Sequence, residues 1–217
     1  MKKIFLDVGG HLGQTLEEVV KPSYLFDAIY CFEPSVEHAS LIVEKFQDPR
    51  LEVLPYGLSN VSGESELFSN GLHDMGASVK TGANRPQSTS TVCLLKKASE
   101  FFAEVIGEDD LVIMKLNCEG SECDIMNDLI DGNQIFKLDN VMIDFDVRKF
   151  PRLAQEEPAL KKRLEEIGFD HFSLAEKVMR GRTHQNRIAN WLRSLPWHEK
   201  FRPRANWSER LKGAILR

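Results

Sequence analysis

Short apolar runs alternate with stretches of helical spacing along the first two-thirds of the chain. Apolar residues between Val36 and Phe46 recur every three or four positions, which is typical of an amphipathic helix. Runs of four to seven mostly apolar residues predict strands at Ile4–Val8, Ala28–Phe32, Leu51–Leu54, Leu111–Leu116 and Val141–Val147. This alternation indicates βαβ units, so we expect an α/β fold with a mostly parallel, doubly wound, Rossmann-like sheet.

The remaining pattern predicts further elements and one long loop. The expected elements are helices at Thr15–Lys21, Ala98–Ile106, Ser121–Ile130 and Ala159–Ile167, and strands at Glu64–Phe68 and Thr91–Leu95. Residues 69–91 are rich in serine, threonine, glycine and asparagine, and loops of this length are often functional. We expect this loop to lie beside a binding site, with His73 and Ser78 close to it, and to close over a bound ligand.

Charge is distributed unevenly along the chain. Residues 176–217 contain eleven lysines and arginines against three glutamates, a net charge of +8, while residues 1–175 carry −13. We therefore predict a main domain over 1–175 and a basic extension over 176–217. The extension holds Trp191, Leu192, Leu195, Trp197 and Trp207, and its apolar residues favour docking on the main domain or a homodimer contact. An anionic surface or a disordered end are alternatives, and nucleic acid is not the expected partner.

Composition favours a soluble cytoplasmic protein. The chain is 42% hydrophobic and 28% charged, which is ordinary for a globular domain, and it has no transmembrane segment of about 20 apolar residues. Asp7 interrupts the apolar run near the N-terminus, so we expect no export signal. Cys31, Cys93, Cys118 and Cys123 form no paired-cysteine motif, which predicts reduced thiols and no metal site.

Two turns at strand ends carry candidate binding chemistry. The first is Asp7-Val8-Gly9-Gly10-His11-Leu12-Gly13, where glycines allow a sharp turn and close approach to a ligand. Its spacing differs from the GxGxxG of dinucleotide enzymes, and alone it fits a plain strand-to-helix turn. The second is Phe32-Glu33-Pro34, where Glu33 follows Gly13 by 20 residues. An acid at this place in a Rossmann-like sheet accepts the ribose hydroxyls of an adenosine cofactor.

A third turn, Lys115-Leu116-Asn117-Cys118-Glu119-Gly120-Ser121-Glu122, follows the most apolar strand. Polar groups there face the ligand crevice of a parallel sheet. Glu119 and Glu122 also fall near the N-terminus of the next expected helix, so complementation of the helix dipole is the alternative role. Because Lys115 lies within an apolar strand, we expect an ion pair with one of these two acids.

These segments, together with Gly57-Leu58-Ser59-Asn60-Val61-Ser62-Gly63 and Gly76-Ala77-Ser78-Val79, resemble the FkbM-type methyltransferases over residues 4–147. The motifs appear in the family's order. Two positions depart from the pattern: Asn117 replaces the signature aspartate, and Lys96 replaces another. The basic extension lies outside the resemblance.

The resemblance implies a class I methyltransferase fold and transfer of a methyl group from S-adenosyl-L-methionine. It implies a hydroxyl acceptor on a small molecule, such as a natural product, or on a sugar or glycan, as in polysaccharide biosynthesis. Expected cofactor-binding residues are Asp7, Gly9, Gly10, His11, Gly13, Glu33, Pro34, Ser35, Gly57, Leu58 and Asn117. Expected catalytic residues are Glu119 as the favoured base, with Asn117, Lys115, Glu122 and His73.

Several alternatives stay open. Asp144 and Asp146 alternate along the predicted strand Val141–Val147, so they should point to opposite faces, and Asp144 is a second candidate base. A divalent-metal site formed by one of these two acids near Asn117 is a minor alternative. A nicotinamide-dependent oxidoreductase is disfavoured because the first turn lacks GxGxxG. The changes at Asn117 and Lys96 also allow a non-catalytic binding protein with a degenerate methyltransferase fold.

Overall fold

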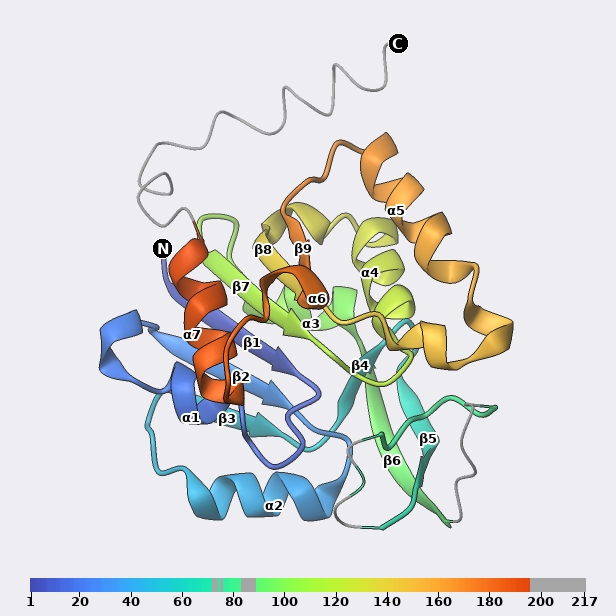
Figure 1. The fold of residues 1–217 in the computed structure, drawn as a ribbon, viewed down its shortest axis with the longest axis horizontal. Helices are drawn as coiled ribbons and strands as arrows, with labels where there is room; N and C mark the ends of the chain where they lie inside the picture. Colours follow the sequence, from blue (N-terminus) through green and yellow to red (C-terminus); the bar gives the residue numbers. More distant parts are fainter. Residues whose placement is uncertain (72–73, 75, 83–88, 196–217) are drawn as a thin grey trace.

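The computed structural model describes residues 1–71, 74, 76–82 and 89–195, and a six-stranded sheet forms its centre (Figure 1). Its strands are β1 (Lys3–Val8), β2 (Ala28–Phe32), β3 (Leu51–Leu54), β7 (Leu111–Leu116), β8 (Leu138–Ile143) and β9 (Phe172–Leu174). They lie in the order β3-β2-β1-β7-β8-β9, and every neighbouring pair is parallel. This is the order of a doubly wound Rossmann-type sheet, so the predicted α/β class is confirmed.

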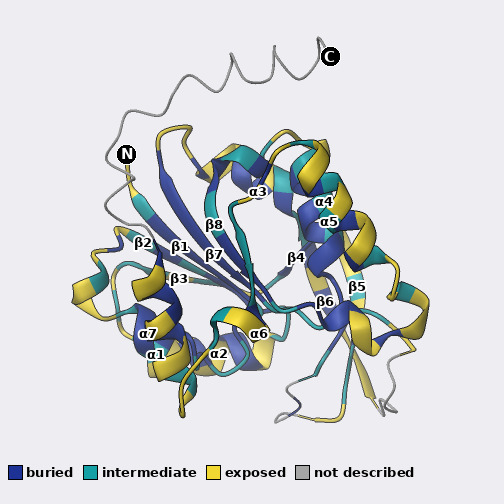
Figure 2. Ribbon diagram, turned by 45° about the horizontal axis from the view of Figure 1, so that its top comes forward, coloured by how far each residue is buried: buried dark blue, intermediate teal, exposed yellow. Residues whose placement is uncertain are grey.

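Helices cover both faces of this sheet. The helices are α1 (Leu16–Val19), α2 (Val36–Lys45), α3 (Ala98–Val105), α4 (Glu122–Asp131), α5 (Glu156–Glu166), α6 (Ala175–Val178) and α7 (His184–Ser194). Phe5 and Ile113 pack with α1, α2 and α7 in one core, while Leu6 and Val112 pack with α3, α4 and α5 in the other. Side chains alternate along each strand, so one apolar run supplies both cores. Figure 2 shows the buried strands between the two helical layers.

The chain also forms a smaller, three-stranded sheet. It contains β4 (Gly57–Ser59), β5 (Gly63–Ser69) and β6 (Thr89–Lys97) in the order β4-β6-β5. The pattern did not predict β4, and β6 extends beyond the expected Thr91–Leu95. Ser78 adds an antiparallel bridge to Phe68. The described part of the segment between β5 and β6 is therefore attached to this sheet.

Strand β8 ends earlier than the expected Val141–Val147, and this changes the placement of Asp144 and Asp146. It ends at Ile143, and Asp146–Lys149 form a 3-10 turn. The Asp144 N–H donates to Leu116 O at 2.9 Å, and the Asp146 N–H donates to Asp144 O at 2.9 Å. Because the backbone turns back on itself here, the prediction that these acids alternate along a strand is wrong.

Helix α7 docks on the sheet through its apolar face. Trp191 is 1% exposed, Leu192 0% and Leu195 6%. The Trp191 ring meets Phe5 edge-on, with ring centroids 6.2 Å apart. The expected docking of these three side chains is confirmed, whereas Trp197 and Trp207 lie outside the described residues. Within the described ranges, no helix combines the length and apolarity needed to cross a membrane.

Candidate functional site

The three predicted turns meet at the carboxyl ends of β1, β2 and β7. The N–H groups of Gly9 and Gly10 both donate to Phe32 O at 3.1 Å, and the Asn117 N–H donates to Val8 O at 3.1 Å. The turn after β1 is thus tied to both neighbouring strand ends. This is the switch point of the sheet, where open α/β folds bind ligands.

Packing within the protein explains two of the glycines. Gly9 has φ +83°, and a Cβ there would lie 1.8 Å from Asn117 O. A Cβ on Gly10 would lie 2.3 Å from Cys31 Sγ. Close packing against neighbouring residues therefore requires glycine at both positions, whether or not a ligand binds beside them.

Glu33 is held at the end of β2 by backbone donors. Its carboxylate accepts the His11 N–H at 2.7 Å and the Ser35 N–H at 2.9 Å. His38 Nδ1 lies 3.7 Å from Glu33 Oε1, and Glu33 is only 6% exposed. The Ser35 side chain caps α2 by accepting the His38 N–H. These contacts fix the carboxylate beside the glycine turn.

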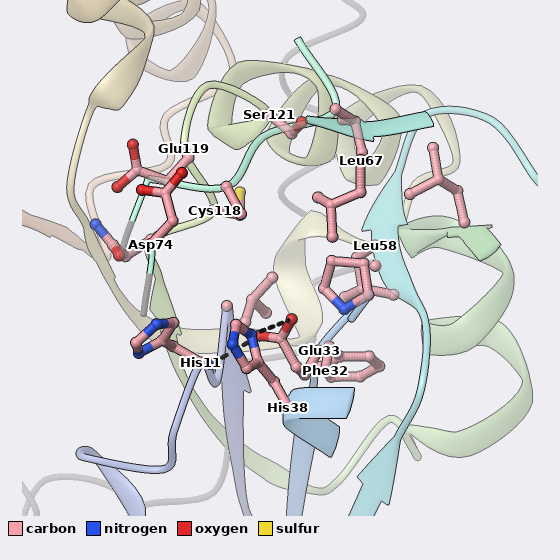
Figure 3. A pocket seen from close by; sticks show the side chains of 18 residues that line it. His11, Phe32, Glu33, His38, Leu58, Leu67, Asp74, Cys118, Glu119 and Ser121 are labelled. Atoms are coloured by element: carbon pink, nitrogen blue, oxygen red, sulfur yellow. Dashed lines mark hydrogen bonds and ion pairs between the residues drawn. The ribbon is translucent and has the colours of Figure 1, made fainter. Parts of the chain in front are cut away.

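Glu33 faces an inner pocket of about 70 Å³ (Figure 3). Phe32, Leu58 and Leu67 give this pocket an apolar wall. His11 Nε2 and Ser121 Oγ are buried without a hydrogen-bond partner among the described residues. The predicted residues that line it are Gly9, His11, Glu33, Pro34, Gly57, Leu58, Asn117 and Glu119.

An outer cavity of about 870 Å³ adjoins the inner pocket. The two share Gly9, His11, Asn117 and Glu119 in their walls. The outer wall is rich in charged and polar groups, and it also contains Gly10, Gln14, Thr15, Lys115, Asp144, Asp146, Lys149, Glu176, His184 and Arg187. Asp144 and Asp146, which the sequence placed on opposite faces, therefore line the same cavity.

The partner of Lys115 differs from the one expected. Lys115 Nζ lies 3.1 Å from Asp7 Oδ1 and donates to Gly9 O at 2.7 Å. Asp7 is fully buried, and burial raises its pKa while the Lys115 ammonium lowers it. The predicted pairing with Glu119 or Glu122 is wrong, because Asp7 faces Lys115 directly across the β1–β7 register.

Glu119 joins a small network of charged groups. Lys149 Nζ lies 2.7 Å from Glu119 Oε2 and 3.0 Å from Asp146 Oδ1, and Asn117 Nδ2 donates to Asp146 Oδ2 at 3.2 Å. Burial raises the pKa of Glu119 to about 7; the Asp146 carboxylate adds to this rise, and Lys149 opposes it. The carboxyl can therefore gain or lose a proton near neutral pH.

Glu122 holds the loop between β7 and α4. Its Oε1 accepts the N–H groups of Cys118 at 3.1 Å and Gly120 at 3.0 Å. Burial raises the pKa of Glu122 to about 7. The structure places it outside the walls of both cavities, as it does the other predicted site residues Asp7, Gly13 and Ser35. His73 lies outside the described residues.

Sequence reasoning missed several residues of the site. Asp74 lines the inner pocket and accepts the N–H groups of Asn70 at 2.7 Å and Gly76 at 3.0 Å. His184 of α7 lines the outer cavity, with Nε2 3.0 Å from Thr15 Oγ1. No local motif marks either residue. Among the described residues, no three histidine, cysteine or acidic side chains group closely enough to hold a metal ion.

Comparison with known proteins gives one structural likeness. No family model matches the chain, and no curated protein matches it. The chain is similar to a crystal structure of methyltransferase FkbM from Methylobacillus flagellatus KT, with a TM-score of 0.46 and 14% identity. The match covers 74% of this chain and 37% of that one. Activity, cofactor and acceptor therefore have to be inferred from the residues of the site.

Proposed function

We propose that this protein is an S-adenosylmethionine-dependent methyltransferase. The observation that carries the proposal is the Glu33 carboxylate, which lies at the end of β2 beside the glycine turn and faces the inner pocket. In Rossmann-type sheets an acid at this place accepts the ribose hydroxyls of an adenosine cofactor. The motifs from Asp7 to Glu122 follow the order of those in FkbM-type enzymes, and this resemblance also supports the proposal.

The surroundings of Glu33 suit an adenosine group. Phe32 and Leu58 offer apolar contacts. His11 Nε2 and Ser121 Oγ, which have no hydrogen-bond partner in the described part of the chain, offer hydrogen bonds. Small-molecule sites usually enclose about 300–1,000 Å³, so the outer cavity is large enough but the inner pocket is not. Binding therefore requires the inner wall to open. Asp74, which belongs to the loop expected to move, forms part of that wall, whereas Ala77 and Val79 flank Ser78 and its bridge to β5.

The chemistry assigns roles to residues at the junction of the two cavities. The bound cofactor supplies an electrophilic methyl group. Glu119 takes the proton of the acceptor hydroxyl on its carboxylate, and a pKa of about 7 suits a general base at neutral pH. Lys149 stabilises the charged carboxylate across 2.7 Å, and Asn117 orients the acceptor through its amide.

The outer cavity supports a hydroxyl-bearing acceptor. Asp144, Gln14 and Arg187 line it and can donate to or accept from several hydroxyl groups at once. A sugar or glycan, or a polyhydroxylated natural product, presents groups of this kind. We therefore assign O-methylation of such an acceptor to this cavity.

Isothermal titration with two cofactors tests the proposal. We expect S-adenosylmethionine to bind the purified chain, and NAD⁺ to bind far more weakly. Binding of NAD⁺ in preference to S-adenosylmethionine would overturn the assignment in favour of an oxidoreductase. Binding of neither would leave the degenerate, non-catalytic fold as the better interpretation.

A further inference from the structure

Ser78 lies at a fixed place between β5 and the loop that carries Glu119. Its N–H donates to Phe68 O at 2.9 Å, and its carbonyl accepts the Phe68 N–H at 2.8 Å. Ser78 is 1% exposed. The backbone of Ser78 is therefore held by the small sheet independently of its side chain.

The Ser78 hydroxyl reaches the loop after β7, 41 residues away. Its Oγ donates to Glu119 O at 2.5 Å and accepts the Lys80 N–H at 2.9 Å. A second contact runs parallel to the first, because Lys80 Nζ pairs with Asp124 in the first turn of α4. The segment 76–80 thus contacts both the loop after β7, at Glu119, and the first turn of α4, at Asp124.

The peptide between Glu119 and Gly120 is held from both sides. Its carbonyl accepts the Ser78 hydroxyl, and its N–H donates to Glu122 Oε1 at 3.0 Å. Glu119 has φ +53°, a left-handed conformation that a residue with a side chain rarely adopts without support. Gly120 has φ +107°, and a Cβ there would lie 2.6 Å from the Phe150 ring. The local chain therefore depends on these two hydrogen bonds for its orientation.

We propose that Ser78 is a positioning residue, whose hydroxyl keeps the Glu119 peptide in this orientation so that the Glu119 carboxylate stays beside Lys149 at the junction of the two cavities. The importance of this role for catalysis rests on the proposed methyltransferase function. The geometric claim itself concerns only residues of this chain. It can therefore be tested without cofactor or acceptor.

The test measures the titration midpoint of the Glu119 carboxyl carbon by NMR, on the full chain labelled with ¹³C-glutamate. Glu119→Gln assigns the resonance. Ser78→Thr keeps the hydroxyl, and Ser78→Val has the shape of threonine without the hydroxyl. Ser69→Ala is the matched control, because Ser69 lies on β5, next to Phe68 that Ser78 bridges, and bonds Thr89 instead.

In the wild-type chain and in Ser78→Thr we expect a midpoint near 7, the value that burial gives this carboxyl. In Ser78→Val the peptide relaxes and the carboxyl moves toward water, so the midpoint falls toward 4.5, its ordinary value. Ser69→Ala should match the wild type. Equal midpoints in all variants would overturn the proposal, and so would a fall in Ser78→Thr as large as that in Ser78→Val. If S-adenosylmethionine fails to bind, only the proposed function fails, because this measurement needs no cofactor.

Discussion

Lys115 Nζ lies 3.1 Å from Asp7 Oδ1 in the interior of the central sheet, and both side chains are buried. The two residues face each other in the register of β1 and β7. Lys115 also donates to the carbonyls of Val8 and Gly9 at 3.4 and 2.7 Å, just where the glycine turn begins. The pair therefore links the interior of the sheet to the candidate site.

Removing one partner should destabilise the fold more than removing both. Lys115→Met leaves the Asp7 carboxylate buried without a counter-charge, and we expect a loss of roughly 3–5 kcal/mol in the free energy of unfolding. Asp7→Asn combined with Lys115→Met should recover a large part of that loss. Urea denaturation measures both. If the double variant loses the sum of the two single losses, the charges are not coupled.

Stability should fall as pH rises, through Glu122. The pKa of this buried carboxyl is about 7 in the folded chain, against 4.5 as its ordinary value. Between these values the folded state holds a proton that the unfolded state releases, so rising pH favours unfolding. Stability from this group is complete below 4.5 and lost by about 7, on the order of 3 kcal/mol.

Glu122→Gln should therefore flatten the dependence of unfolding free energy on pH in this range. Glu165→Gln, at an exposed position of α5, is the control and should leave the curve unchanged. Urea denaturation at several pH values gives the curve. An equal slope in the wild type and in Glu122→Gln would show that this carboxyl does not carry the effect.

Helix α7 should contribute to the stability of the whole domain. Trp191 packs on Phe5 in the core, so Trp191→Ala should cost about 3–5 kcal/mol in the free energy of unfolding, and Trp191→Phe less. Arg193→Ala changes an exposed position of the same helix and should stay near wild type. Thermal or urea unfolding compares the three. A near-neutral Trp191→Ala would contradict the docking of α7.

Local pattern predicted the elements that position the site. The apolar runs at β1, β2 and β7 fix the three strands, and the polar residues that follow each run fall at one edge of a parallel sheet. The places of Gly9, Glu33 and Asn117 near one another follow from that arrangement alone. This part of the fold depends on periodicity, which the sequence displays directly.

Contacts between distant residues could not be predicted in this way. The sequence alone did not determine which acid forms the ion pair with Lys115. The register of β1 and β7 places Asp7 opposite it. Apolar Phe145 and Val147 seemed to extend β8, but they are buried by a turn after its end. His184 meets Thr15 across 169 positions, so no motif could place it in the outer cavity.

Glu119 should affect turnover more than cofactor binding. A general base typically contributes about 10²–10⁴-fold to the rate, so Glu119→Gln should lose that factor with an acceptor identified by screening sugars and natural products. Its affinity for S-adenosylmethionine should stay close to that of the wild type. Formation of S-adenosylhomocysteine measures the rate. If Asp144→Asn loses the activity and Glu119→Gln keeps it, Asp144 is the base.

Calorimetric titration of Glu33→Gln with S-adenosylmethionine tests the central claim most directly. The substitution keeps the shape of the side chain and removes the charge that would hold the ribose, so binding should weaken by roughly 1.5–3 kcal/mol. Glu37→Gln, on the exposed face of α2, should bind as the wild type does. Unchanged affinity in Glu33→Gln would contradict the assignment of this pocket to the cofactor.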